Sequence, residues 1–110
     1  MPRTAIPLPL DLLADFCRRH GIARLEVFGS ILRDDFGPES DIDILFTLAP
    51  GAPELSSHWL RFDIHDELEA ILGRRVDFIR RSTIEASRNP ERKAVILESA
   101  EVLVDLARAA

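Results

Sequence analysis

The chain has 110 residues, a size that predicts a single domain over residues 1–110 with one hydrophobic core and room for one site. Hydrophobic residues make up 46% of the sequence and are spread along it, which excludes an intrinsically disordered protein. The formal net charge is −5, from 19 acidic and 14 basic residues. This balance argues against a free-standing protein that binds nucleic acid, because such proteins normally carry a basic surface.

The cysteine content and the hydropathy of the chain indicate the compartment in which the protein is expected. The single cysteine, Cys17, excludes an internal disulfide and a zinc cluster of the cysteine type, and it fits a reducing compartment. Residues 1–10 lack the continuous apolar run of a signal peptide, and no stretch approaches the length of a membrane span. We therefore expect a cytoplasmic protein with no membrane partner.

The first predicted element is a helix that follows Pro9. Asp11 is its expected N-cap, because a short acidic side chain can accept hydrogen bonds from the free N–H groups of the first turn. Gly21 is its expected end, since glycine adopts the left-handed conformation that closes many helices. Four apolar side chains share one face of this predicted helix: Leu12, Leu13, Phe16 and Cys17.

Two strands with a loop between them are predicted next. Residues 23–28 alternate in the direction of their side chains and predict a strand that Gly29 and Ser30 end. A short helix is expected to open at residues 31–33, and the Gly-Pro pair makes residues 34–40 a loop. Residues 41–48 form the strongest strand prediction, because every second side chain is apolar.

The second half of the chain continues the alternation of helices and strands. A long helix capped by Ser56 or Ser57 should end at Gly73, and a strand should occupy residues 75–80. Asn89-Pro90 predicts the start of a helix that runs to about Glu98, and residues 101–106 predict a last strand. The whole pattern predicts an α/β or α+β fold, with a small mixed sheet of about four strands flanked by helices.

Asp41 and Asp43 are the first candidates for chemistry. Residues two apart on a strand point to the same face, so these two carboxylates should lie side by side. Neighbouring carboxylates repel each other, and a divalent cation would relieve that repulsion. Mg²⁺ prefers one or two carboxylates and completes its coordination with water and substrate phosphates.

A third acid and a glycine-serine turn extend this candidate site. Asp77 interrupts an apolar strand, and it can join the cluster if that strand lies beside the strand of Asp43. Three acids suit a clamp of two metal ions about 3.5–4 Å apart. Gly29 lets a phosphate approach the backbone, while the Ser30 hydroxyl and nearby N–H groups can donate to it.

The pattern resembles a known family. Gly29-Ser30, ten intervening residues and then Asp41-Ile42-Asp43 resemble the signature of the polymerase-beta-type nucleotidyltransferases, and more closely that of the minimal nucleotidyltransferase (MNT) group. The similarity extends to Ser40, to Arg33 and to the later segments 72–77 and 89–90. The chain departs from many members at Asp34, where they have glycine.

The resemblance implies a nucleotidyltransferase fold and a set of roles. Asp41, Asp43 and Asp77 would be the catalytic, metal-binding acids, with Asp77 a ligand or the general base. The implied cofactor is Mg²⁺, with two ions, and the implied substrate is ATP or another nucleoside triphosphate. Four residues would bind the nucleotide, with Arg33 either assisting the phosphates or bracing the loop: Gly29, Ser30, Arg33 and Ser40.

The same resemblance implies a partner and an activity. Members of the group act as antitoxins that transfer AMP from ATP to a tyrosine of a HEPN-type toxin, so we expect a protein adenylyltransferase in a hetero-oligomer. One alternative is a catalytically idle antitoxin that binds and occludes its toxin. Another is the subunit of an enzyme that modifies a small molecule, as aminoglycoside nucleotidyltransferases do.

Some of the charged residues also have plainer explanations. Asp77 alone could be a strand residue that pairs with Arg75 or Arg80. Arg92 and Lys93 could be an ordinary surface pair in the first turn of their helix. Neither of these explanations needs a ligand.

Overall fold

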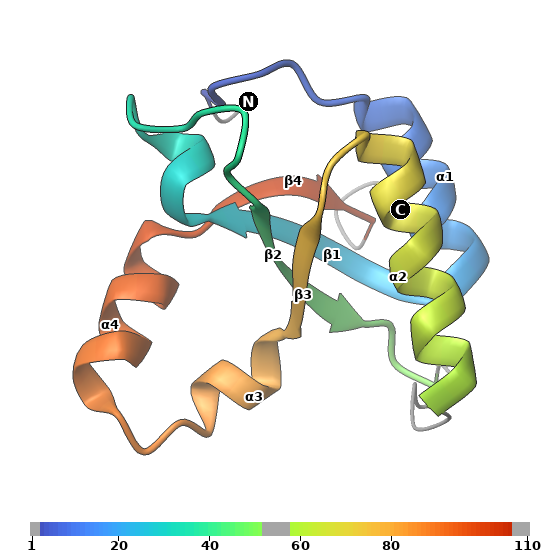
Figure 1. Ribbon diagram of the computed structural model, residues 1–110. Helices are drawn as coiled ribbons and strands as arrows, with labels where there is room; N and C mark the ends of the chain where they lie inside the picture. The colour runs from blue at the N-terminus through green and yellow to red at the C-terminus, as the bar shows by residue number, and fades with distance from the viewer. Residues whose placement is uncertain (1–2, 52–57, 107–110) are drawn as a thin grey trace.

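The computed structural model describes residues 3–51 and 58–106, with side chains described from residue 63 onward in the second range. It contains one mixed sheet of four strands in the order β3-β2-β1-β4, shown in Figure 1. β1 pairs antiparallel with both β2 and β4, whereas β2 and β3 are parallel. The elements in chain order are α1 (Leu10–His20), β1 (Ile22–Phe28), the 3₁₀ helix η1 (Gly29–Leu32), β2 (Ile42–Leu48), α2 (His58–Leu72), β3 (Val76–Arg80), α3 (Arg81–Glu85), α4 (Pro90–Ser99) and β4 (Glu101–Asp105).

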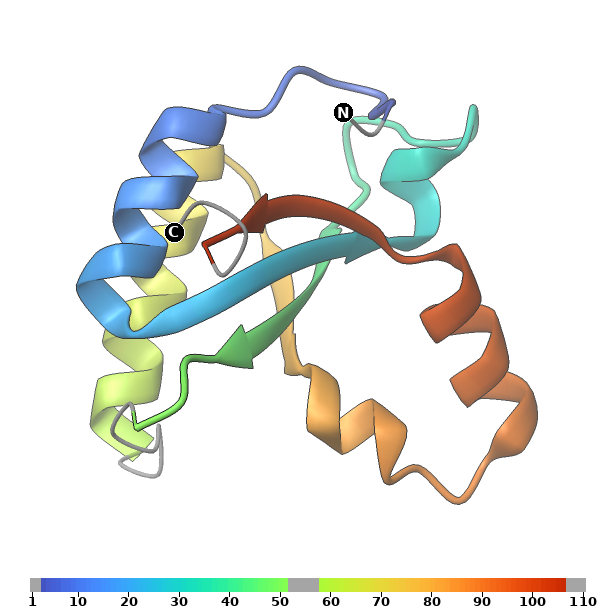
Figure 2. The ribbon, with the colours of Figure 1, turned by 180° about the vertical axis from the view of Figure 1, so that it is seen from behind.

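The helices cover both faces of the sheet. α1 and α2 lie together against one face, and α3 and α4 lie on the other side, as Figures 1 and 2 both show. The main core lies under α1 and α2, where alternate strand residues point toward the helices. Its largest side chains include Phe16 of α1 and Phe46 of β2, whose ring stacks on Phe78 of β3 at 4.2 Å between centroids. No described helix has the length and apolar character needed to cross a bilayer.

A smaller core lies on the second face of the sheet. Phe28 and Leu45 contribute from β1 and β2, and Ile84 and Ile96 contribute from α3 and α4. This cluster anchors both short helices to the sheet. Because α4 is fixed in this way, its other side chains have defined positions relative to the end of β1.

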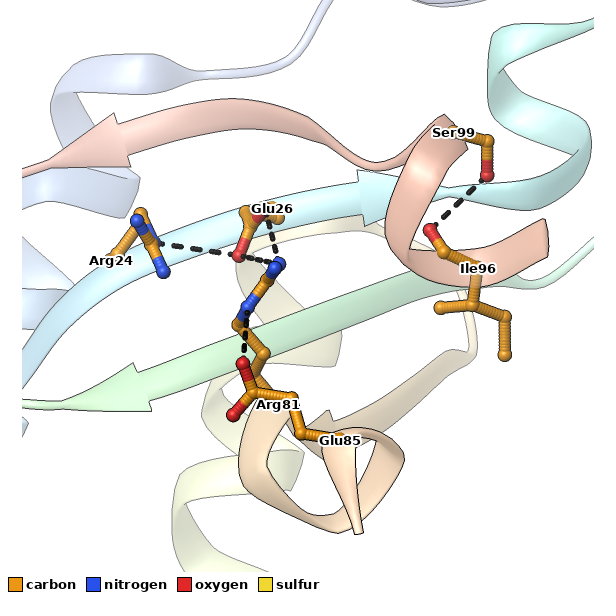
Figure 3. A network of polar contacts seen from close by, with 6 residues as sticks. All are labelled: Arg24, Glu26, Arg81, Glu85, Ile96 and Ser99. Atoms are coloured by element: carbon orange, nitrogen blue, oxygen red, sulfur yellow. Dashed lines mark hydrogen bonds and ion pairs between the residues drawn. The ribbon is translucent and has the colours of Figure 1, made fainter. Parts of the chain in front are cut away.

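A buried ion pair reinforces the same face. Glu26 on β1 is only 5% exposed, and both of its carboxylate oxygens accept from Nη1 of Arg81 at 2.8 Å. Figure 3 shows Arg81 extending from α3 toward β1, with Arg24 beside Glu26 and Glu85 on the other side of Arg81. A buried carboxylate needs such a partner, because an unpaired charge in the interior is strongly destabilising.

Most of the predicted elements are confirmed, with shifts of a residue or two at their ends. Gly21 closes α1 with φ 68°, and the Asn89 side chain caps α4 by accepting from the backbone N–H of Arg92 at 3.1 Å. The cap predicted for α1 was wrong, because Pro9 is the N-cap and Asp11 lies inside the first turn. The predicted caps Ser56 and Ser57 lie outside the described residues.

Two short helices differ from what the sequence predicted. The short helix after β1 starts at Gly29 and ends at Leu32, so Arg33 is extended and belongs to the loop. α3 was not predicted, because its five residues are too few to show a helical hydrophobic pattern. α3 nevertheless matters, since it carries Arg81 to the buried Glu26.

Candidate active site

Three of the candidate segments meet at one end of the sheet. Asp43 on β2 is the direct register partner of Phe28, the last residue of β1, and of Asp77 on β3. The parallel pairing of β2 with β3 therefore brings two acids from distant parts of the sequence onto adjacent strands. The turn that begins with Gly29 follows immediately on the other side of Asp43.

Gly29 is in close contact with one of these acids. Its φ is +77°, a left-handed conformation that L-residues with a side chain rarely adopt. A Cβ at this position would lie 2.3 Å from Oδ2 of Asp43, well inside van der Waals contact. The glycine is thus required both by the turn and by the carboxylate that lies against it.

Asp43 carries unbalanced negative charge. Partial burial raises the pKa of its carboxyl above the ordinary value, and repulsion from Asp77 and Asp41 raises it further. Attraction to the Arg33 guanidinium acts in the opposite direction but does not cancel these effects. A cation at this place would stabilise the charged carboxylate, so the residues present fit the divalent metal that the sequence pattern implies.

A cavity of about 620 Å³ opens in front of the two acids. The strand side of its wall holds Asp43 and Asp77, and Gly29, Ser30 and Arg33 continue it after β1. The rest of the lining comes from the end of β1 and from α4 with its N-cap. Those residues are Phe28, Asn89, Glu91, Arg92, Val95 and Ile96.

Two of the predicted site residues lie off this wall. β2 begins at Ile42, one residue later than predicted, and Asp41 directly before it is exposed and pairs with Nε of Arg75 at 3.2 Å. The Ser40 hydroxyl accepts from the backbone N–H of Gly37 at 3.0 Å, which closes a turn of the preceding loop. The structure thus brings Asp43 and Asp77 together with the glycine-serine turn, and it places Asp41 beside them rather than on the cavity wall.

Arg74 holds the loop that precedes Asp41 and Asp43, and the sequence pattern did not single it out for this role. Its Nη1 donates to the carbonyl oxygens of Gly37 and Ser40 at 2.9 and 3.0 Å. Its guanidinium also lies over the Phe36 ring, 4.5 Å from the centroid. These contacts join residues about 35 positions apart, so only the folded chain reveals them.

A second group of possible metal ligands has a structural explanation. His65, Asp66 and Glu69 place donor atoms within 4.8 Å of one another. However, Nε2 of His65 is 2.6 Å from the Val76 carbonyl oxygen, and Glu69 accepts from the Val76 N–H at 2.7 Å. The two side chains thus satisfy the backbone where β3 begins, one residue before Asp77.

Sequence comparisons agree with this geometry. A family model described as a nucleotidyltransferase domain matches residues 10–103. A candidate protein adenylyltransferase of Methanocaldococcus jannaschii is 36% identical over 66 residues, which cover 60% of this chain and 67% of that protein. The protein adenylyltransferase MntA of Thermococcus cleftensis is 34% identical over 68 residues, which cover 62% of this chain and 65% of that protein.

Solved structures share the fold. A candidate minimal nucleotidyltransferase has a TM-score of 0.61 at 27% identity, with 84% of this chain and 86% of that chain covered. A toxin-antitoxin structure with AMP-PNP has a TM-score of 0.64 at 16% identity, with 93% of this chain and 77% of that chain covered. A complex of a tri-AMPylated Shewanella oneidensis HEPN toxin with an MNT antitoxin has a TM-score of 0.54 at 15% identity, with 91% and 72% covered.

The family match covers most of the chain, and the four-stranded mixed sheet with its flanking helices is the fold of these neighbours. The chain therefore belongs to the nucleotidyltransferase domain family, and its relatives are of the minimal, MNT type.

Proposed function

We propose that the chain is a divalent-cation-dependent protein adenylyltransferase that transfers AMP from ATP to a hydroxyl group of a HEPN-type toxin. The observation that supports this function best is the pairing of Asp43 with Asp77 across two parallel strands, beside Gly29 and in front of a cavity. The names of two relatives, both protein adenylyltransferases, support the same reaction class.

The proposed reaction exchanges one bond to phosphorus for another. The oxygen of the acceptor hydroxyl attacks the α-phosphorus of ATP, the bond to the β-phosphate bridging oxygen breaks, and pyrophosphate leaves with its electron pair. The acceptor loses its proton, and Asp77 is an exposed carboxylate on the cavity wall that can accept it. A bound divalent cation would neutralise phosphate charge and lower the pKa of the attacking hydroxyl.

The other residues of the wall bind and orient the nucleotide in this proposal. Gly29 and Ser30 line the same cavity, so the Ser30 hydroxyl and the backbone N–H groups of this turn are the proposed donors to phosphate oxygens. Gly29 allows the backbone to approach both the phosphates and Asp43. Arg33 lines the cavity and also pairs with Asp35 at 3.0 Å. In this proposal the ion pair holds the positive charge of Arg33 near the phosphates.

A label-transfer assay tests the activity. ATP labelled at the α-phosphate and Mg²⁺ are incubated with the chain and its HEPN-type partner, and label in the partner is measured. We expect label with the wild-type chain, and at least about a hundredfold less with Asp43→Asn or Asp77→Asn or after removal of the metal by EDTA. Asp63→Asn, at an exposed acid of α2 away from the cavity, is the matched control and should transfer normally.

Failure to label an intact partner would contradict the proposed activity. Equal label from the Asp43→Asn and wild-type chains would contradict the proposed site. A growth assay with the toxin then separates catalysis from occlusion, because an antitoxin that only binds would still neutralise after the double change Asp41→Asn and Asp43→Asn. We expect that double variant to lose neutralisation.

A further inference from the structure

The cavity in front of the acids is also lined by a basic residue of α4 that the proposed mechanism leaves unused. Arg92, in the first turn of α4, lines this cavity together with Val95 and Ile96. Residues 92, 95 and 96 are three and four apart, so they share one face of the helix. Ile96 is buried in the smaller core, which directs this face of α4 toward the site.

The position of Arg92 is defined by its backbone. The Arg92 N–H donates to the Asn89 side chain at 3.1 Å, which fixes the first turn of a ten-residue helix. Figures 1 and 2 show α4 on the same side of the molecule as η1, the short helix that starts at Gly29. Both helices contribute to the lining of the cavity, η1 through Gly29 and Ser30 and α4 through the face that carries Arg92.

The charges around the cavity leave Arg92 available for a ligand. Its ionisable wall residues are the acids Asp43, Asp77 and Glu91 and the bases Arg33 and Arg92. Arg33 is already engaged by Asp35. Among the side chains that the structure describes, none forms an ion pair with Arg92, whose side chain is exposed.

We propose that Arg92 is a nucleotide-binding residue that contacts, from α4, the phosphates of the nucleoside triphosphate bound at Gly29 and Ser30. This proposal rests on the proposed function, because it takes a triphosphate as the ligand. A guanidinium group suits the task, since its planar fork of N–H donors matches phosphate oxygens and its charge is permanent. Glu91 adds a negative charge to the same cavity. We therefore expect Arg92 to strengthen the binding of a triphosphate, which carries more negative charge, more than the binding of a monophosphate.

Nucleotide affinity tests this assignment without relying on catalysis. The dissociation constants of Mg·ATP and AMP are measured by calorimetry for the full chain, alone and in complex with its HEPN-type partner. We expect Arg92→Gln to weaken Mg·ATP binding about tenfold and to change AMP binding less than about twofold. Arg92→Lys should recover part of the loss, because it keeps the charge but not the fork.

Lys93→Gln is the matched control, since it removes the same charge from the same helix turn at a residue that does not line the cavity. It should bind Mg·ATP as the wild type does, and both glutamine variants should unfold at the wild-type temperature to within a few degrees. Wild-type Mg·ATP affinity in Arg92→Gln would overturn this assignment while leaving the proposed function intact. A wild-type chain that binds no nucleotide in either state would overturn both.

Discussion

Gly29→Ala provides a sensitive test of the candidate site, because it perturbs Asp43 without changing any charge. The substitution has two separable costs. The first is backbone strain at φ +77°, which is about 1–2 kcal/mol for an alanine. The second is the overlap of the new Cβ with Oδ2 of Asp43 at 2.3 Å, which forces the carboxylate to move.

Gly73→Ala isolates the first of these costs. Gly73 has φ +69° at the end of α2, and a Cβ there would have no atom within 4 Å. It should therefore lose only the strain energy, which lowers the melting temperature by about 4–8 °C in a domain of this size. Gly29→Ala should lose more, by about 1–3 kcal/mol for the overlap.

The effect on activity should separate the two variants more sharply than the effect on stability. Displacement of a catalytic carboxylate by about 1 Å typically costs about a hundredfold in rate. We expect this loss in label transfer from Gly29→Ala and near-normal transfer from Gly73→Ala, both measured well below their melting temperatures. If Gly29→Ala transferred label as fast as Gly73→Ala, the contact with Asp43 would have no part in the chemistry.

Three further predictions follow from buried or repelled groups. Asp43 has a raised pKa, so without metal the wild type loses stability as pH rises from the ordinary value near 4 through the raised one. Asp43→Asn should avoid this loss and melt at a higher temperature than the wild type at pH 7 in EDTA; a lower temperature would show that burial and repulsion do not destabilise the Asp43 carboxylate. Arg81→Met should cost about 2 kcal/mol in denaturant unfolding, because it removes both short hydrogen bonds to the buried Glu26 and leaves only the longer ion pair with Nε of Arg24 at 3.4 Å, whereas Arg19→Met at an exposed pair should cost under about 1 kcal/mol. Burial raises the pKa of the Cys17 thiol to about 12, so a thiol reagent at pH 8 should modify only the unfolded chain; rapid reaction of the native protein would contradict the packing.

The local elements were largely predictable because each has a short-range cause. Alternating side chains predict β1 and β2, Gly21 and Gly73 end their helices, and Asn89 starts α4. The glycine-serine turn and the Asp-x-Asp pattern likewise indicated the candidate site without any structure. The residue roles at that site remain predictions for the assays above.

Only the tertiary structure decided how these pieces meet. Strand order and direction are not encoded in hydrophobic periodicity, so the pairing of Asp77 with Asp43 depends on β3 docking parallel to β2. The same holds for Arg92, which belongs to the cavity because Ile96 packs α4 against the sheet, and for Arg74, whose contacts lie far away in the sequence. The sequence by itself determined the fold class and the chemistry that the acidic pair suggests. The folded chain determined that Asp43 and Asp77 share a cavity with Arg92, because contacts between distant residues are created only when the sheet assembles.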